Sequence, residues 1–311
     1  MTGPARRGSG RPGCLWIAAA LVASVLAACT DVGDVPAGAA ATDDATSGAP
    51  TGAAPTNAPP PDAPPLDDAD ALAQLGEFFG PDLRPQQDGS FGLDQWALVD
   101  TAADTPPGRA LRVSYPEGSV SPAAGREHGT PDGGMQVFLP MAGEPLETAH
   151  LRYWVRLPED FDFVKGGKLP GFYGGTEVSG GEAPDGTDGF STRLMWREDG
   201  AGEVYLYAPD ESGTSLGRGS WTWPVGEWTC VEQQVVLDVP GAANGSVTVW
   251  LDGRQVYSES GLDYRTVGDL RIDGVFFSTF FGGADPSWGP PTDQHADFAG
   301  FAVSPTGRLG C

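Results

Sequence analysis

Hydrophobic and polar residues alternate along short segments from about residue 110 onward. In the segment 149–157, Leu151, Tyr153 and Val155 fall on one face of an extended strand, and polar or amphipathic residues fall on the other. The Asp-Gly pair at 252–253 is typical of a tight hairpin between two such segments. Many short strands with regular turns predict an all-β fold, a β-jelly roll or two-sheet sandwich with one concave face. The other strands are expected at 111–115, 135–139, 190–197, 203–208, 229–239, 246–251, 255–258, 272–280 and 297–303.

The N-terminal 28 residues have the pattern of a targeting signal. Three arginines within residues 1–11 precede an apolar run, 15–28, which is too short for a comfortable membrane span. The run ends in Leu-Ala-Ala followed by Cys29, which resembles the bacterial lipobox. This predicts removal of residues 1–28, lipidation of Cys29 and attachment to the outer face of the cell membrane. Ordinary secretion with an incidental cysteine is the alternative.

Residues 29–75 are interpreted as a tether. Up to about residue 70 they are mostly Ala, Pro, Thr, Gly and Asp, and no aromatic residue occurs. Such a segment buries too little apolar surface to offset the entropy that ordering would cost. The remainder, 76–311, has the length of a single large domain, and a short helix is expected at its start, over 70–79.

The balance of charge restricts the partners. The chain has 42 Asp and Glu against 18 Lys and Arg, a formal net charge of −24, which argues against nucleic acid. Among the basic residues only Lys165 and Lys168 are lysines. A compact ammonium is not replaced by the planar fork of arginine, so we expect at least one of the two to act in a site. A solvated loop lysine is the alternative.

The cysteines predict one disulfide. Of four cysteines, one lies in the targeting segment and Cys29 would receive lipid, which leaves Cys230 and Cys311. Outside the cytoplasm this pair favours a disulfide that fastens residue 311 to a core strand, and two unpaired thiols are the alternative. Neither cysteine has the spacing of a zinc site, so no metal is expected.

Two consecutive strands place polar side chains on one surface. Alternation puts Ser191, Arg193 and Arg197 on one face of the first strand, opposite its apolar residues. In the next strand Tyr205 and Tyr207 also point away from the core. If a hairpin pairs these strands, the five side chains share a surface, and the two lysines lie just upstream.

Such a surface fits β-elimination of a uronic-acid polymer. That reaction needs a cation beside the carboxylate, a base for the adjacent carbon acid and an acid for the departing oxygen. Lys168 and Arg193 would be the cations. A tyrosine would be base and acid in turn, and because its ordinary pKa is near ~10, it would need these cations to reach phenolate. The alternative is that the tyrosines are ordinary exposed strand aromatics and the arginine a rim charge.

Four runs of sequence resemble a known family: K-G-G-K-L-P-G-F-Y-G-G, G-F-S-T-R-L-M-W-R, G-E-V-Y-L-Y and I-D-G-V-F-F-S-T-F-F-G-G-A-D-P-S-W. Over roughly residues 133–304 they are similar to the alginate-lyase-like enzymes of polysaccharide lyase family 14 and the related glucuronan lyases of family 20. The resemblance implies a β-jelly roll that cleaves polyuronates by β-elimination without a cofactor. The motif of this family, a lysine, Ser-x-Arg and Tyr-x-Tyr, falls on Lys168, Ser191, Arg193, Tyr205 and Tyr207.

Two assignments within this motif have rivals. Lys165 competes with Lys168 for the position of the lysine, and Lys168 is preferred because it directly precedes Leu-Pro-Gly. Tyr205 is preferred over Tyr207 as the proton-transfer residue.

Further residues are candidates for substrate binding. Gln136 can hydrogen-bond a carboxylate, or it is an ordinary strand glutamine. His295 lies near two aspartates in sequence and is either a second proton-transfer or binding group or a structural residue. Lys165 and Arg197 would add positive charge. Trp288 either stacks on a sugar or anchors its loop.

The prediction is therefore a monomeric, surface-anchored lyase acting on a polyuronate such as alginate or glucuronan. Because substrate and chain are both anionic, we expect a basic cleft on an acidic body. The main alternative is a surface glycan-binding lipoprotein on the same fold, which would need no proton transfer. A glycoside hydrolase would need two carboxylates facing each other, and only Glu203 lies on the candidate face.

Overall fold

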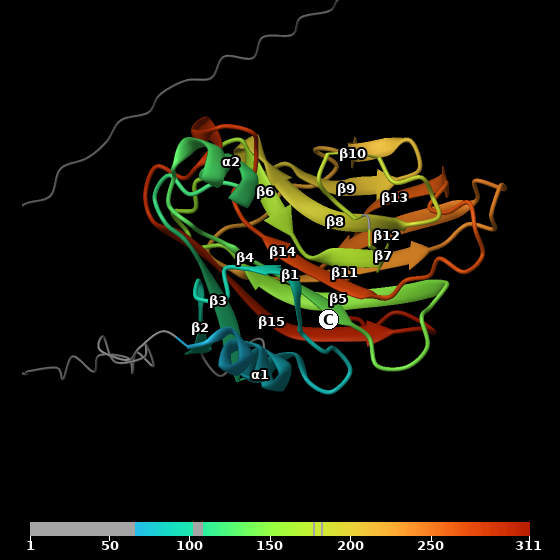
Figure 1. The fold of residues 1–311 in the computed structure, drawn as a ribbon, viewed down its shortest axis with the longest axis horizontal. Helices are drawn as coiled ribbons and strands as arrows, with labels where there is room; N and C mark the ends of the chain where they lie inside the picture. Colours follow the sequence, from blue (N-terminus) through green and yellow to red (C-terminus); the bar gives the residue numbers. More distant parts are fainter. Residues whose placement is uncertain (1–65, 102–107, 177, 182) are drawn as a thin grey trace, which may run out of the picture. The chain divides into compact units, whose positions relative to one another are not determined.

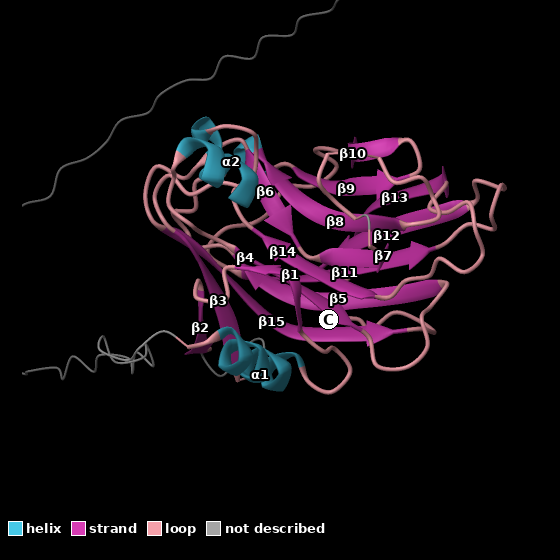
Figure 2. Ribbon diagram, viewed as in Figure 1, coloured by secondary structure: helices cyan, strands magenta, loops and turns pink. Residues whose placement is uncertain are grey.

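The computed structural model describes residues 66–101, 108–176, 178–181 and 183–311. The predicted targeting segment, Cys29 and most of the predicted tether lie outside these residues. In the described part, two antiparallel sheets enclose one large apolar core, and strands dominate the regular structure (Figure 1, Figure 2). The predicted all-β two-sheet sandwich is confirmed.

We call the eight-stranded sheet the cleft sheet. Seven of its strands follow the order β1-β4-β14-β7-β8-β9-β10, and β6 pairs with β8 next to β7. Its strands are β1 (Gln86–Phe91), β4 (Met135–Pro140), β6 (Gly166–Leu169), β7 (Gly171–Gly175), β8 (Gly189–Arg197), β9 (Gly202–Ala208), β10 (Glu211–Leu216) and β14 (Gly274–Thr279).

We call the seven-stranded sheet the outer sheet, with the order β13-β12-β11-β5-β15-β3-β2. Short helical segments lie in the connections and at the start of the described chain. The strands are β2 (Trp96–Asp100), β3 (Arg109–Tyr115), β5 (Thr148–Arg156), β11 (Trp228–Val236), β12 (Gly245–Leu251), β13 (Arg254–Leu262) and β15 (Gln294–Ser304). The helical segments are α1 (Asp68–Phe79), α2 (Pro122–His128), η1 (Glu198–Gly200) and η2 (Pro286–Trp288).

The alternating pattern of the sequence positions the strands. In β5, Leu151, Tyr153 and Val155 are buried in the core between the sheets. The Asp-Gly pair connects β12 to β13, with φ of 49° at Asp252 and 78° at Gly253. Positive φ at both central residues is the geometry that joins twisted strands in a two-residue hairpin.

Helix α1 begins ahead of the domain boundary expected at residue 76. Asp67 caps it, accepting a hydrogen bond from the Asp70 backbone N–H at 2.9 Å. Ala71, Leu75 and Phe79, spaced four residues apart, form its buried face. Residues 66–75, which the sequence assigned to the tether, are therefore part of the folded domain.

The predicted pairing of Cys230 with Cys311 is present as a disulfide, with a Cα–Cα distance of 6.0 Å. Cys230 lies in β11, near the middle of the outer sheet. Next to it, Glu232 accepts hydrogen bonds from the Leu309 backbone N–H at 2.8 Å and from Arg308 Nε at 3.1 Å. The C-terminal segment is thus held on the outer sheet by one covalent and several polar contacts.

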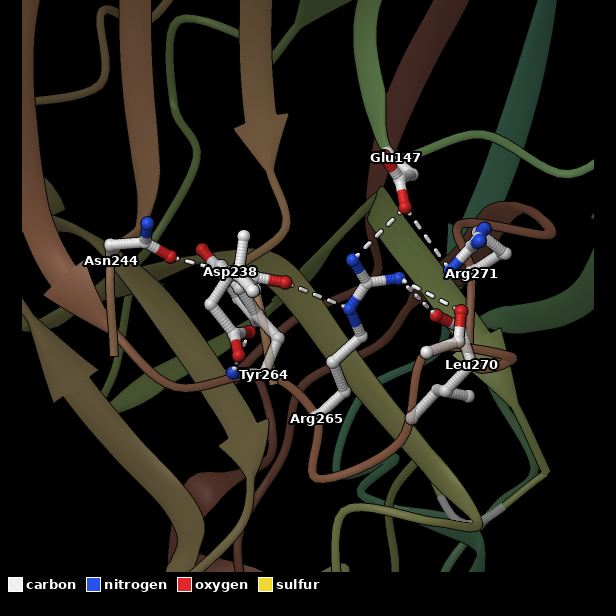
Figure 3. A network of polar contacts seen from close by, with 9 residues as sticks. Glu147, Asp238, Asn244, Tyr264, Arg265, Leu270 and Arg271 are labelled. Atoms are coloured by element: carbon white, nitrogen blue, oxygen red, sulfur yellow. Dashed lines mark hydrogen bonds and ion pairs between the residues drawn. The ribbon is translucent and has the colours of Figure 1, made fainter. Parts of the chain in front are cut away.

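A polar network secures the segment that leads from the outer sheet back to the cleft sheet (Figure 3). Arg265, 3% exposed, donates to the carbonyls of Asp238 at 2.9 Å and Leu270 at 2.7 Å. It also donates to Glu147 at 3.2 Å, and Glu147 pairs with Arg271 at the same distance. Each nitrogen of the buried guanidinium therefore has a hydrogen-bond partner within the fold.

Candidate active site

A pocket of about 820 Å³ opens on the face of the cleft sheet that points away from the core. Of the nine residues predicted to bind or transform a substrate, six line it. The alternation of β8 explains the placement, because Leu194 and Trp196 are in the core while Arg193 and Arg197 face the pocket. The six are Gln136, Lys168, Arg193, Arg197, Tyr205 and Tyr207.

Strand register brings the central side chains together. Arg193 of β8 lies opposite Tyr205 of β9, and Ser191 lies opposite Tyr207. On the other side of β8, Lys168 of β6 lies opposite Met195. Adjacent strands are spaced at about 4.8 Å, so these side chains can meet over one patch of sheet.

Lys168 is a buried amine beside the tyrosines. It is 8% exposed, and its Nζ lies 4.3 Å from the ring centroid of Tyr205 and 5.8 Å from that of Phe280. Burial, and secondarily the charges of Arg193 and Arg197, hold the pKa of Lys168 well below its ordinary 10.5. The amine therefore loses its proton far more readily than an exposed lysine does.

Arg193 is a buried cation without a carboxylate partner among the described residues. It is 3% exposed, and its guanidinium lies 4.5 Å from the ring centroid of Phe276. Its polar contact is a hydrogen bond from Nη1 to Ser278 Oγ at 3.3 Å, and Nε has no partner. Burial lowers its pKa to about 10. An anion entering the pocket would supply the missing counter-charge.

The two tyrosines lie edge to face with ring centroids 5.6 Å apart. Tyr205 is half-buried, and burial together with Tyr207 raises its pKa to about 12. The expectation that neighbouring cations would bring a tyrosine toward phenolate is not met at Tyr205, because burial outweighs the effect of Arg193 and Arg197. Tyr205 is therefore a proton donor at neutral pH.

The pocket wall continues through Gln136 and Arg197. Gln136 donates to the Gly89 carbonyl at 2.7 Å and accepts from Ser278 Oγ at 3.2 Å. Since Ser278 Oγ also accepts a hydrogen bond from Arg193, a chain of hydrogen bonds links Arg193 to Gln136. Arg197 donates to the buried Glu203 at 2.6 Å.

Comparison with known proteins assigns the chain to an enzyme family. The family model of polysaccharide lyase 14 matches residues 103–301. The chain belongs to this family. Its structure is similar to that of a marine family 14 alginate lyase from Aplysia kurodai, with a TM-score of 0.62 and 28% identity over 75% of this chain and 94% of that one.

A second solved structure supports the fold of the family 14 lyase. An alginate lyase from a Chlorella virus matches with a TM-score of 0.60 and 22% identity, over 76% of this chain and 96% of that one. No curated protein sequence matches the chain. The predictions of the family, of a jelly roll and of a polysaccharide lyase are thereby confirmed.

Three predicted site residues of the family 14 lyase do not line the pocket. Ser191 is fully buried, and its hydroxyl donates to the Val178 carbonyl at 2.7 Å. It therefore supports the loop whose next residues, Ser179 and Gly180, do line the pocket. Lys165 is exposed at the rim, where its Nζ contacts Ser287 Oγ.

His295 lies in β15 of the outer sheet, not in the cleft sheet. It shares a strand face with Asp297, which pairs with Arg112 at 2.7 Å. The intervening Ala296 faces the core, so His295 points to the far side of the sandwich. The prediction that it contacts substrate in this pocket is therefore wrong.

Several residues of the pocket escaped the sequence analysis. Arg126 and Glu127 line it from α2, which ends at the left-handed Gly129. Ser121, which caps this helix, followed by a proline at its first position, is a helix start signal that could have found it. Trp288 of η2, for which the sequence offered sugar stacking or a loop anchor, also lines the pocket.

The charges around the pocket match the predicted basic cleft. Its described lining contains four cations but a single carboxylate, Glu127. The facing pair of acids that a glycoside hydrolase needs is thus not found there. The cations are Arg126, Lys168, Arg193 and Arg197.

Two other features are absent from the residues that the structure describes. No three His, Cys, Asp or Glu side chains gather as metal ligands would. No helix there has the length and apolar character needed to cross a bilayer.

Proposed function

We propose that the protein cleaves a polyuronate, alginate or glucuronan, by β-elimination in the pocket of the cleft sheet. The observation that supports this most directly is the buried amine of Lys168 and the buried guanidinium of Arg193 beside a protonated Tyr205. An anionic sugar would supply the counter-charge that Arg193 lacks. The titration behaviour of the amine and the phenol supplies both proton-transfer groups that the reaction needs.

In the proposed reaction, Arg193 neutralises the uronate carboxylate and stabilises the charge that develops when the adjacent carbon loses its proton. The unprotonated amine of Lys168 takes that proton from C5. The electron pair forms the C4–C5 double bond while the C4–O glycosidic bond breaks. Tyr205 donates its proton to the leaving oxygen. This assigns the base to Lys168, whereas the sequence analysis assigned both proton transfers to a tyrosine.

The direct test is incubation of the full chain with alginate and with glucuronan, following the ultraviolet absorbance of the unsaturated uronate. We expect absorbance to rise with one of them and the rate to fall at least 100-fold in Lys168→Ala and Tyr205→Phe, as is usual for lost general acids and bases. Tyr257→Phe is the matched control, because Tyr257 lies outside the pocket lining.

The alternative of a glycan-binding protein predicts a different outcome of the same test. The protein would then be retained in a gel containing one of the polymers but would form no unsaturated product. Retention without product would replace the proposed lyase by a binding function.

We also propose that the enzyme is attached to the outer face of the cell membrane through lipid on Cys29. The lipobox-like sequence before this cysteine supports the proposal. Fractionation of cells that express the full chain tests it. The wild-type chain should sediment with membranes and Cys29→Ser should not, and equal distribution of the two would contradict lipidation.

A further inference from the structure

Glu203 lies on the pocket face of the cleft sheet but does not line the pocket. Its side chain is 0% exposed, although it is an acid. In the register of the cleft sheet, Lys168 lies opposite Met195, and Met195 lies opposite Glu203. The carboxylate and the amine are therefore in one row on the same face, two strands apart, or roughly 9–10 Å between strand axes.

The carboxylate is only partly satisfied by the fold. Its Oε1 accepts a hydrogen bond from Arg197 Nη2 at 2.6 Å. Its Oε2 has no hydrogen-bond partner, and Arg218 Nε lies 4.0 Å from it. A buried carboxylate in such a state costs stability rather than adding to it. Its position therefore points to a role in the pocket.

The charges of neighbouring side chains, including Glu203, also affect the pKa of Lys168. After burial, the charges of Arg193 and Arg197 act to lower the pKa of this amine, and Glu203 is the group that opposes them. The other strand packed against the amine, β14, is followed by Phe280, which brings no charge. The charged and titratable groups that face the amine across the pocket and from the sheet are Arg126, Glu127, Arg193, Arg197, Glu203, Tyr205 and Tyr207.

We propose that Glu203 is a positioning residue of the lyase, which holds Arg197 at the pocket wall and counters the positive charge around Lys168. This rests on the proposed function in so far as Lys168 is the base. Through Oε1 it holds the guanidinium of Arg197 at the pocket wall, where that cation can contact the anionic polymer. Through its charge it keeps the amine basic enough to take a carbon-bound proton, since a weaker base transfers protons more slowly.

The two lysines of the chain make the charge effect directly measurable. In full-length protein labelled with ¹³C-lysine, NMR gives one side-chain signal for Lys168 and one for the exposed Lys165, which is the internal reference. We expect Glu203→Gln to lower the titration midpoint of Lys168 by about one pH unit, the effect of removing a unit charge at roughly 9–10 Å at an effective dielectric constant of about 20. An unchanged midpoint in folded Glu203→Gln protein would overturn the proposal.

A matched variant separates this effect from loss of a buried acid in general. Glu232 of the outer sheet is also 0% exposed and paired with an arginine, Arg308. Glu232→Gln should reduce stability yet leave the Lys168 midpoint in place. If it shifts the midpoint as far as Glu203→Gln does, the proposed specific coupling is wrong.

Kinetics test the two parts of the role. Glu203→Gln removes the charge, so the acid limb of the kcat/KM profile should move about one pH unit lower. It keeps an acceptor for Arg197, so KM should stay within about twofold of the wild-type value. Glu203→Asp keeps the charge but no longer reaches Arg197, so KM should rise about tenfold with the limb unmoved. An unchanged KM in Glu203→Asp would show that Glu203 does not hold Arg197 for substrate binding. If Glu203→Gln does not fold, the KM of Glu203→Asp still tests the proposal.

Failure of the proposed function is distinguishable from failure of this inference. A wild-type chain without product on alginate and glucuronan contradicts the lyase, whatever Glu203 does. A working lyase whose Lys168 titration shifts while its pH profile stays in place overturns the role of Glu203 in the reaction.

Discussion

At the scale of single residues, two buried arginines with the same exposure have opposite surroundings. Arg265 has carbonyl and carboxylate partners around its guanidinium, whereas Arg193 has one hydroxyl and an unpaired Nε. A buried cation without a partner destabilises the folded state, which proteins tolerate where function needs it. The exposure of both, 3%, makes them a matched pair.

We expect Arg193→Met to raise the free energy of unfolding by roughly 1 kcal/mol, or about 2–4 °C in Tm, while abolishing activity. Arg265→Met should lower the free energy of unfolding by roughly 3 kcal/mol, because it leaves the buried carbonyls of Asp238 and Leu270 without their donor and removes one of the two arginines that pair with Glu147. Thermal unfolding of both variants checks the pair. A destabilised Arg193→Met would show that this guanidinium stabilises the fold.

The pH dependence of the reaction follows from three shifted pKa values. Activity should rise with pH as Lys168 loses its proton, well below 10.5, and should fall as Arg193 loses its charge near about 10 and Tyr205 its proton near about 12. A kcat/KM profile measured across neutral and alkaline pH checks this. If a tyrosine were the base, the rise itself would lie near about 12.

Alternation within a strand was enough to predict which residues face the pocket on β8 and β9. It could not predict what each side chain would contact. Ser191 has the expected face but bonds to a neighbouring carbonyl, and His295 belongs to the other sheet. The Ser191 contact depends on how a nearby loop folds, and the place of His295 depends on strand order, which pairs segments far apart in sequence and leaves no local signal.

At the scale of elements, β6 shows how packing makes a strand from a glycine-rich run. A Cβ on Gly167 would lie 2.0 Å from the Trp196 ring, and one on Gly171, at the start of the next strand β7, would lie 2.2 Å from the Thr192 carbonyl. Only glycine allows this close approach, by which the backbone carries Lys168 into the sheet. Sequence patterns assign such a run to a loop, because no side-chain alternation marks it.

The disulfide should stabilise the outer sheet chiefly by restricting the unfolded chain, because its cysteines are 81 residues apart. We expect Cys311→Ser to lower the free energy of unfolding by about 2–4 kcal/mol, measured by chemical denaturation. Reduction of the wild-type protein is the control and should have the same effect. If the oxidised and the reduced wild-type protein were equally stable, the polar contacts of Glu232 alone would hold the C-terminal segment.

At the scale of the whole molecule, a basic pocket is set in a chain of net charge −24. Repulsion between the body and an anionic polymer acts over about 30 Å at 0.01 M salt and only about 8 Å at 0.15 M. The pocket cations act at contact distance, where screening is weaker.

We therefore expect kcat/KM on the polymer to rise as salt increases from about 0.01 M to about 0.15 M and to fall again near 1 M, when contacts in the pocket are screened. A series in sodium chloride checks this, with an uncharged viscosity agent as control. A steady decrease from the lowest salt would show that the pocket, not the body, governs the approach of the polymer.

The order of strands has a consequence for synthesis of the protein. In the cleft sheet β14 lies between β4 and β7, and in the outer sheet β15 lies between β5 and β3. The strands that fill the middle of both sheets thus leave the ribosome after the other described strands. Until then each sheet is two separate halves with unpaired inner edges, which are prone to aggregation. A nascent chain that stops before Gly274 would depend on chaperones throughout its life.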